Sequence, residues 1–130
     1  MYKRTMTYTD FNGVTRKEDF YFHFSEAEIA EMELTMPGGM SNLLNRIVDA
    51  KEEHELVKIF KDLILKSYGE KSPDGKRFMK SEEISKAFSQ TQAYSDLFME
   101  LATDSNAASA FVNAIIPDNI RNRNELPVIQ

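Results

Sequence analysis

The chain has 130 residues, which suit one hydrophobic core and leave little for a second. Hydrophobic residues make up 42% and charged residues 28%, a composition typical of a folded domain and not of a disordered chain. The formal net charge of -5 disfavours nucleic acid and anionic membranes as partners, and the lack of cysteine excludes disulfides, thiolate metal sites and thiol nucleophiles. No run approaches the roughly 18 apolar residues that span a bilayer, so we expect a cytosolic protein.

The N-terminal segment has the alternation of a β-hairpin. Large and small residues alternate over residues 2–8, and Phe20, Phe22 and Phe24 occupy every second position, which is the period of half-buried strands. Residues 10–13 end in Asn-Gly and supply a turn between the two segments. We therefore expect two antiparallel strands before residue 25.

The length of this turn follows from the apolar faces. A two-residue turn would set the apolar side chains of the first strand opposite polar ones. A three-residue loop that ends at a left-handed Gly13 instead sets Tyr2 opposite Phe22. The same register sets Met6 opposite Glu18 and gathers the apolar residues on one face. We predict this bulged hairpin.

The first helix is predicted to begin at a capping box. Ser25 can accept hydrogen bonds from exposed amides, Glu28 completes the box three residues later, and the Pro-Gly-Gly of residues 37–39 ends the helix. At about 100 degrees per residue the helix has two apolar seams. The first seam consists of Ile29, Met32 and Met36, and the second of Ala27, Ala30 and Leu34. A helix with two seams is expected to contact two neighbours.

Two more helices are predicted before residue 70. Ser41 caps a short helix, whose inward residues are Leu43, Leu44, Ile47 and Val48. The next helix spans residues 53–68 before Gly69 and divides into an apolar and a charged arc, as an amphipathic surface helix does. Leu65 is an exception, because it lies among the charged residues.

Residues 70–80 are predicted to form a loop around a turn at Pro73, Asp74 and Gly75. The loop holds four basic and two acidic side chains, so it is locally positive on an acidic protein. This charge either contacts an acidic protein surface or keeps the loop soluble, and we favour the second interpretation.

Three cap residues, Ser81, Thr91 and Asp104, predict the last three helices. The final helix ends at Pro117 and has an unusually wide apolar arc, which indicates deep burial. That arc consists of Ala107, Ala108, Phe111, Val112, Ile115 and Ile116. Residues 118–130 have no helical period and are predicted to form an extended tail.

These elements predict an α+β fold, mostly α, in which an N-terminal β-hairpin packs on a bundle of five to six short helices. We expect one globular domain over residues 1–117, with the hairpin at 1–24, helices over 25–117 and the tail at 118–130. The shared core is predicted from the main apolar face of each element. It consists of Phe20, Phe22, Phe60, Leu63, Phe98, Phe111 and Ile115.

The sequence offers no catalytic or metal-binding constellation. Neither His23 nor His54 has a second ligand at helical spacing, so structural roles are expected for both. The acidic residues of the first helix are divided between two polar faces, which is the pattern of solvated charges. We therefore expect a non-enzymatic protein with no cofactor and no metal.

Short helices over residues 81–102 could also suggest a helix-turn-helix regulator. Residues 82–116 contain one basic residue, Lys86, and five acidic ones, which gives this region a net charge of 1 - 5 = -4. A DNA-binding face requires the opposite charge, so the sequence argues against this class.

Several segments together resemble small proteins of long-tailed phages and prophages of Gram-positive bacteria, encoded between the tail tube and tape measure proteins. The resemblance covers about residues 8–117. It rests on Tyr8-Thr-Asp-Phe-Asn-Gly13, Glu18-Asp-Phe-Tyr-Phe22, Ile29-Ala-Glu-Met-Glu-Leu34 with Pro37-Gly-Gly39, Phe60-Lys-Asp-Leu-Ile-Leu-Lys-Ser-Tyr-Gly69, Lys71-Ser-Pro-Asp-Gly-Lys-Arg-Phe78 and Phe98-Met-Glu-Leu-Ala102.

Proteins of this kind are usually tail assembly chaperones. The resemblance implies a protein that binds the phage tape measure protein, keeps it soluble and helps to recruit tail tube subunits. It further implies a location in the host bacterial cytoplasm and absence from the mature virion. The alternative is a structural tail or head-tail component that stays in the virion. Whether the chain forms a homo-oligomer is left open.

The candidate partner-binding residues are apolar positions that lie off the main stripe of their helices. A purely structural helix more often carries a polar residue there. The candidates are Ala27, Ala30, Leu34 and Leu65. For Ala27 and Ala30, close packing on another element is an equally good explanation. Leu65 is expected to face solvent.

Overall fold

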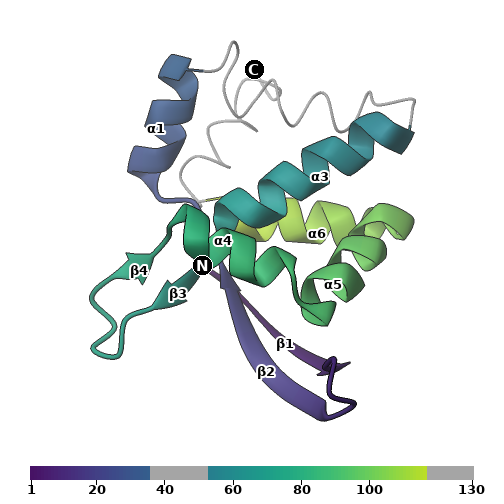
Figure 1. The fold of residues 1–130 in the computed structure, drawn as a ribbon. Coiled ribbons are helices and arrows are strands. Elements are labelled where there is room, and N and C mark those ends of the chain that lie inside the picture. Colours follow the sequence, from purple (N-terminus) through teal and green to yellow (C-terminus); the bar gives the residue numbers. More distant parts are fainter. Residues whose placement is uncertain (36–52, 117–130) are drawn as a thin grey trace.

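A computed structural model describes residues 1–35 and 53–116 of the chain (Figure 1). The predicted helix after Ser41, the predicted helix end at residues 37–39 and the predicted tail lie outside these residues. The described elements are β1 (Tyr2–Thr9), β2 (Thr15–Phe22), α1 (Glu26–Thr35), α3 (Glu53–Ser67), β3 (Tyr68–Lys71), β4 (Phe78–Met79), α4 (Glu82–Ser89), α5 (Gln92–Thr103) and α6 (Ser105–Ile115).

The β1–β2 hairpin has the predicted register. Tyr2 pairs with Phe22, Met6 pairs with Glu18, and Gly13 has a φ of 79°. The Asp10 carboxylate accepts hydrogen bonds from the amides of residues 12 and 14, each at 2.9 Å, and holds the loop in shape. The bulged three-residue loop is therefore confirmed, because only this register places the apolar residues of both strands on one face.

A second hairpin follows α3 directly and was not predicted. The strands β3 and β4 extend the sheet to four strands in the order β1-β2-β3-β4. The turn at residues 73–75 is where the sequence places it, but it joins two strands instead of lying in an open loop. These strands have four and two residues, which are too few to show an alternating pattern, and β3 forms by pairing with the distant β2.

Gly69 allows the two strands of this second hairpin to approach. A Cβ atom at this position would lie 2.7 Å from a ring carbon of Phe78 and 2.8 Å from the carbonyl oxygen of Met79. Both separations are shorter than real Cβ contacts, so a larger residue would push β4 away. The close approach of β3 and Phe78 thus depends on glycine.

The predicted helix caps are all present in the described part. Ser25 and Glu28 form the reciprocal capping box, with hydrogen bonds of 3.1 and 2.9 Å. Ser81 and Thr91 accept from amides three residues later, at 3.0 and 3.1 Å. Asp104 accepts from two amides of the first turn of α6. Local sequence therefore sets where these four helices begin.

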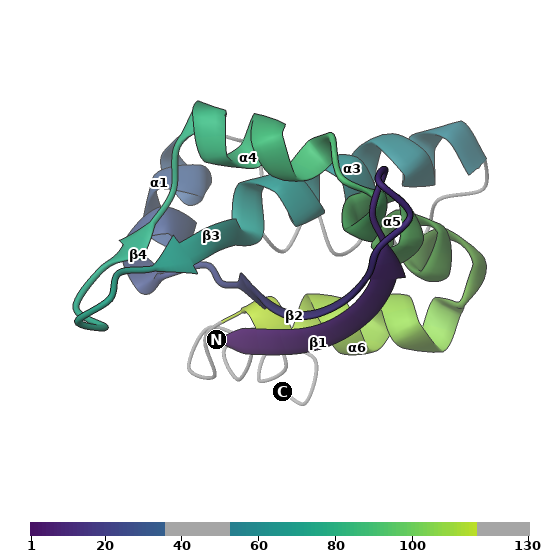
Figure 2. The ribbon, with the colours of Figure 1, turned by 60° about the horizontal axis from the view of Figure 1, so that its bottom comes forward.

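The helices α3 to α6 gather beside the curved β1–β2 hairpin, with α5 and α6 in contact with β1 (Figures 1 and 2). The helix α1 stands apart from this group (Figure 1). The predicted fold class, α+β and mostly α with an N-terminal hairpin, is confirmed.

The core lies between the inner face of the sheet and the helices. Phe22 is fully buried and its ring contacts those of Tyr2, Tyr68, Phe88 and Phe111. Six of the seven predicted core residues are buried: Phe20, Phe22, Phe60, Leu63, Phe111 and Ile115. The seventh, Phe98, is only partly buried, because its side chain also lines a surface groove.

Candidate partner-binding surfaces

The outer face of α1 carries three of the residues singled out in the sequence. Ala27 and Ala30 are exposed, and Leu34 is 88% exposed. Ile29, on the other seam, is buried to 1% exposure. The two seams of this helix therefore lie in different environments, and the seam of Ala27, Ala30 and Leu34 is a surface. This geometry makes it available for contact with a partner.

Leu65 is not the solvent-facing residue that its charged neighbours suggest. Its side chain is partly buried and packs against the core. Ser85 Oγ donates a hydrogen bond of 2.9 Å to the Leu65 carbonyl oxygen, which brings α4 over this part of α3. The expectation fails because a neighbouring helix covers a position that the helical period alone assigns to water.

A groove of about 400 Å³ runs between α3 and α5. It is lined by Val57, Lys61, Ser89, Tyr94, Ser95, Phe98 and Met99. Val57 is 41% exposed and Met99 is 54% exposed, so two apolar side chains reach water at its rim. A groove of this kind between two helices can accept the apolar stripe of a third helix.

One charged side chain, that of Lys61, lines this groove on the α3 side, and it is exposed. The exposed Asp62 of the same helix also acts on the groove, because burial and then its negative charge raise the pKa of Tyr94. Methionine at the rim adds an unbranched, polarisable side chain that adapts to different partner shapes. The groove therefore suits an apolar helix that brings an acidic residue to Lys61.

The sequence does not predict this groove, although Val57 lies in the amphipathic helix expected over residues 53–68. The available signal was an apolar arc wider than one neighbouring helix covers. Which part of that arc stays uncovered depends on where α5 packs, and no local pattern contains that information.

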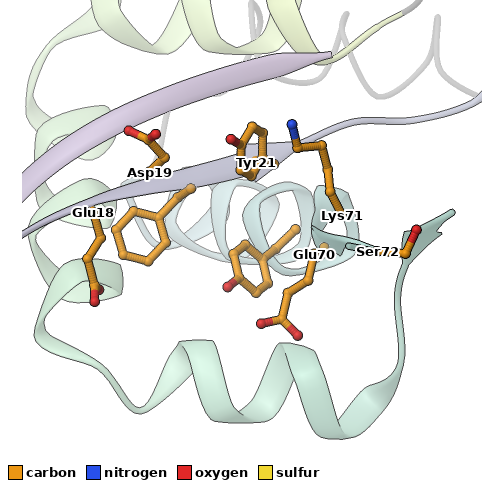
Figure 3. Close-up of a pocket in the computed structure, with 9 residues that line it drawn as sticks. Glu18, Asp19, Tyr21, Glu70, Lys71 and Ser72 are labelled. Atoms are coloured by element: carbon orange, nitrogen blue, oxygen red, sulfur yellow. The ribbon is translucent and has the colours of Figure 1, made fainter. Parts of the chain in front are cut away.

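A second hollow, of about 530 Å³, lies where β3 separates from β2 (Figure 3). It is lined by Glu18, Asp19, Phe20, Tyr21, Tyr68, Gly69, Glu70, Lys71 and Ser72. Glu18 and Glu70 extend from the two strands to the same side of this hollow in Figure 3. Burial, followed by the negative charges of Glu70 and Glu18, raises the pKa of Tyr68 to about 12. The hollow is therefore acidic on that side.

A polar cluster joins α1 to the second hairpin. Lys80 Nζ donates to the His23 carbonyl oxygen at 2.6 Å and to Glu28 Oε2 at 2.7 Å. The same ammonium lies 4.7 Å from the centroid of the Phe24 ring. These contacts fix the orientation of α1 at its first turn and do not assemble a nucleophile with a base.

His23 has a structural environment. Its ring stands edge-on to Phe78 with a centroid separation of 6.0 Å, and Nδ1 is buried without a hydrogen-bond partner in the described part of the chain. Burial lowers the pKa of His23, so the neutral imidazole is favoured. The side chain of His54 is not among those that the structure describes.

Among residues 1–35 and 53–116, no group of three or more His, Asp or Glu side chains is placed to hold a metal ion. None of the helices in this part of the chain is both long and apolar enough to cross a membrane.

The basic turn of the second hairpin is ordered by its own hydrogen bonds, in which Ser72 Oγ donates to Asp74 and accepts from the Arg77 amide.

Comparison with known proteins relates nearly the whole sequence to one family. A family model described as "Phage tail assembly chaperone" matches residues 1–127, nearly the full chain. Comparison with curated proteins gave no match, and neither did comparison with solved structures.

Proposed function

This chain belongs to the phage tail assembly chaperone family, and we propose that it binds the tape measure protein of a long-tailed phage of Gram-positive bacteria. In this role it keeps the tape measure protein soluble and helps tail tube assembly. The observation that carries the proposal is the apolar groove between α3 and α5. The role is that of a binding protein without catalysis.

The groove suits a tape measure protein because such a protein is a long helical chain with exposed apolar seams. A helix that lays its seam between α3 and α5 would cover Val57 and Met99, which are otherwise in contact with water. An acidic residue beside that seam would approach Lys61. Burial of the seam removes the apolar surface through which free tape measure chains aggregate.

The outer face of α1 supplies a second contact in this proposal. Ala27, Ala30 and Leu34 form a short apolar surface, and Leu34 is almost fully exposed. Two weak sites on one chaperone, repeated along one filament, bind more firmly than either alone because the second contact is intramolecular. Leu65 has a smaller part here than the sequence suggested, since α4 covers part of it.

We place the protein in the host bacterial cytoplasm and outside the mature virion. The alternative is a structural tail or head-tail component that remains in the particle. Mass spectrometry of purified virions separates the two, because a structural component is recovered in fixed proportion to the tube protein. Recovery at that proportion would replace the chaperone role with the structural one.

The binding proposal is tested by co-expression with the tape measure protein of the same phage. The wild-type chain should raise the soluble fraction of that protein and co-purify with it. Met99→Lys and Leu34→Lys should each reduce co-purification, because both place a charge in the proposed contact. Ala110→Lys is the matched control, since it adds the same charge at an exposed position of α6.

The outcomes distinguish the role from the surface. If the wild-type chain neither solubilises nor binds the tape measure protein, the proposed function is wrong. If it binds, and Met99→Lys binds as well as Ala110→Lys, the role stands and the groove is not the contact. All three variants should keep the wild-type melting temperature, because their side chains are exposed.

A further inference from the structure

One edge of β2 is largely without a partner strand. β1 pairs with β2 along all eight residues, whereas β3 pairs with it only at Tyr21 and Phe22. Residues 15–20 of β2 therefore have a second edge that no strand covers in the described part of the chain. This edge faces the hollow between β2 and β3 (Figure 3).

The backbone groups on that edge can be assigned by alternation. The His23 amide donates to the Ser67 carbonyl at 2.8 Å, so His23 and, two residues earlier, Tyr21 direct their backbone groups towards β3. Because every second residue of a strand points its backbone groups to the same edge, Lys17 and Asp19 each direct an amide and a carbonyl to this edge as well. These groups form the start of a ladder to which another strand can add.

The strand β3 pairs with β2 only at its first two residues, Tyr68 and Gly69. Its last two residues pair with β4 instead, Glu70 with Met79 and Lys71 with Phe78. The ammonium of Lys71 lies 4.6 Å from the centroid of the Tyr21 ring, at the point where the strands diverge. Beyond that point the hollow is bounded by two strand edges, one from β2 and one from β3.

The charges around the hollow specify the partner. Its lining contains three carboxylates, Glu18, Asp19 and Glu70, and one ammonium, Lys71, for a net charge of 1 - 3 = -2. Asp19 already has Lys3 and Thr5 as partners. Glu18 accepts a hydrogen bond from Tyr8 and attracts the nearby Arg16, but within the described residues neither Glu18 nor Glu70 makes a direct ion pair. A partner with basic side chains on one face would neutralise both.

We propose that this hollow binds an extended, basic segment of a partner protein, which adds to the free edge of β2 as a further strand. Its backbone bonds to the outward amides and carbonyls of Lys17 and Asp19, and every second side chain is a lysine or arginine directed to Glu18 and Glu70. The site is separate from the helical groove, so this chaperone has two surfaces for two kinds of segment.

The probe is a peptide of about five Lys-Thr repeats, whose lysines all lie on one face when it is extended. We expect it to bind, to shift the amide resonances of Lys17 and Asp19, and to slow hydrogen exchange there. The same peptide with N-methylated threonines keeps its charge but loses donors on one edge. It should bind about tenfold more weakly. Equal binding of the methylated peptide, without slowed hydrogen exchange at Lys17 and Asp19, would show a merely electrostatic contact and overturn strand addition.

Two sets of variants test the assignment on the protein. The double variant Glu18→Gln with Glu70→Gln should bind the Lys-Thr peptide about tenfold more weakly, whereas Glu26→Gln, an exposed change on α1, should not alter binding. Lys17→Pro removes one outward amide and leaves the bonds to β1 intact, so it should also weaken binding. If Lys17→Pro does not fold, the hydrogen-exchange result still decides.

Two other results overturn the proposal. Lys17 and Asp19 amides that become protected with rising protein concentration, together with dimers in sedimentation, would assign the edge to a second copy of the chain. Absence of binding by any peptide would leave the charged edge as protection against aggregation. Neither result depends on the tape measure protein, so this test and that of the proposed function fail separately.

Discussion

Lys80 Nζ lies 2.7 Å from Glu28 Oε2. Lys80 directly follows β4 and Glu28 lies in the first turn of α1, so this ion pair connects the second hairpin to α1. Burial raises the pKa of Glu28, but hydrogen bonds from Lys80 and from the Ser25 amide lower it below the usual value. Burial lowers the pKa of Lys80, and the hydrogen bond to Glu28 raises it only part of the way back to the usual value. The pair is favourable for the carboxylate and costly for the ammonium, so its net contribution is small.

We expect a coupling energy of about 1 kcal/mol between these two residues. The measurement is a double-mutant cycle in urea with Lys80→Met, Glu28→Gln and the combined variant. Methionine keeps an apolar stem but removes the ammonium and its contacts with the Phe24 ring and the His23 carbonyl. These losses do not involve Glu28 and cancel in the cycle, which therefore reports the ion pair. Additive effects of the two single changes would show that the pair does not hold α1.

The acid stability of the protein should depend on Glu28. Its folded pKa lies below the usual value of 4.5, so the folded state favours the charged form. The stability from this shift is present above pH 4.5 and is lost as the pH falls below it, through the folded pKa. Glu28→Gln should therefore have a smaller loss of urea stability between pH 5.5 and about 3 than the wild-type chain. Parallel pH profiles would contradict the assigned shift.

Tyr68 should govern part of the alkaline stability. Its pKa is raised from 10.0 to about 12, and its ring stacks on Phe88 with a centroid separation of 4.0 Å. The stability from keeping this phenol neutral is fully present below pH 10 and is lost as the pH rises towards 12. Tyr68→Phe keeps the ring stack and removes the ionisation. Its stability should fall less than that of the wild-type chain between pH 10 and about 12.

Two glycines should respond to substitution for different reasons. A Cβ at Gly13 meets nothing within 4 Å, but its φ is positive, so Gly13→Val should cost roughly 1 kcal/mol or more from backbone strain. Gly13→Asn is the control and should cost less, because asparagine tolerates this conformation. Gly69→Ala should be costly through its clash with Phe78. Equal stabilities of the Val and Asn variants at position 13 would contradict the strain argument.

Substitution by lysine should change the free energy of unfolding at Leu65 but hardly at Leu34. Leu65 is partly buried against the core, so Leu65→Lys should lower the free energy of unfolding by about 1 to 2 kcal/mol. Leu34 is 88% exposed, and Leu34→Lys should change stability by no more than about 0.5 kcal/mol. Thermal and urea unfolding of both variants provide the check. A neutral Leu65→Lys would restore the solvent-facing assignment made from the helical period.

The sequence by itself determined the features that depend on neighbouring residues. The register of the first hairpin follows from its apolar faces and from Gly13, and the helix starts follow from cap residues such as Ser81 and Thr91. These choices are made within a few residues, where local hydrogen bonds and steric limits decide the conformation. Six of the seven core residues predicted from the main apolar faces are buried.

Only the tertiary structure decided which surfaces remain open. The pairing of Tyr68 and Gly69 with β2 turns the expected end of a helix into a strand, because a distant strand supplies hydrogen-bond partners that the local sequence does not. The packing of α4 covers Leu65, and the packing of α5 leaves Met99 at the rim of a groove. Periodicity assigns a residue to a face of its own element, whereas burial depends on which other element covers that face.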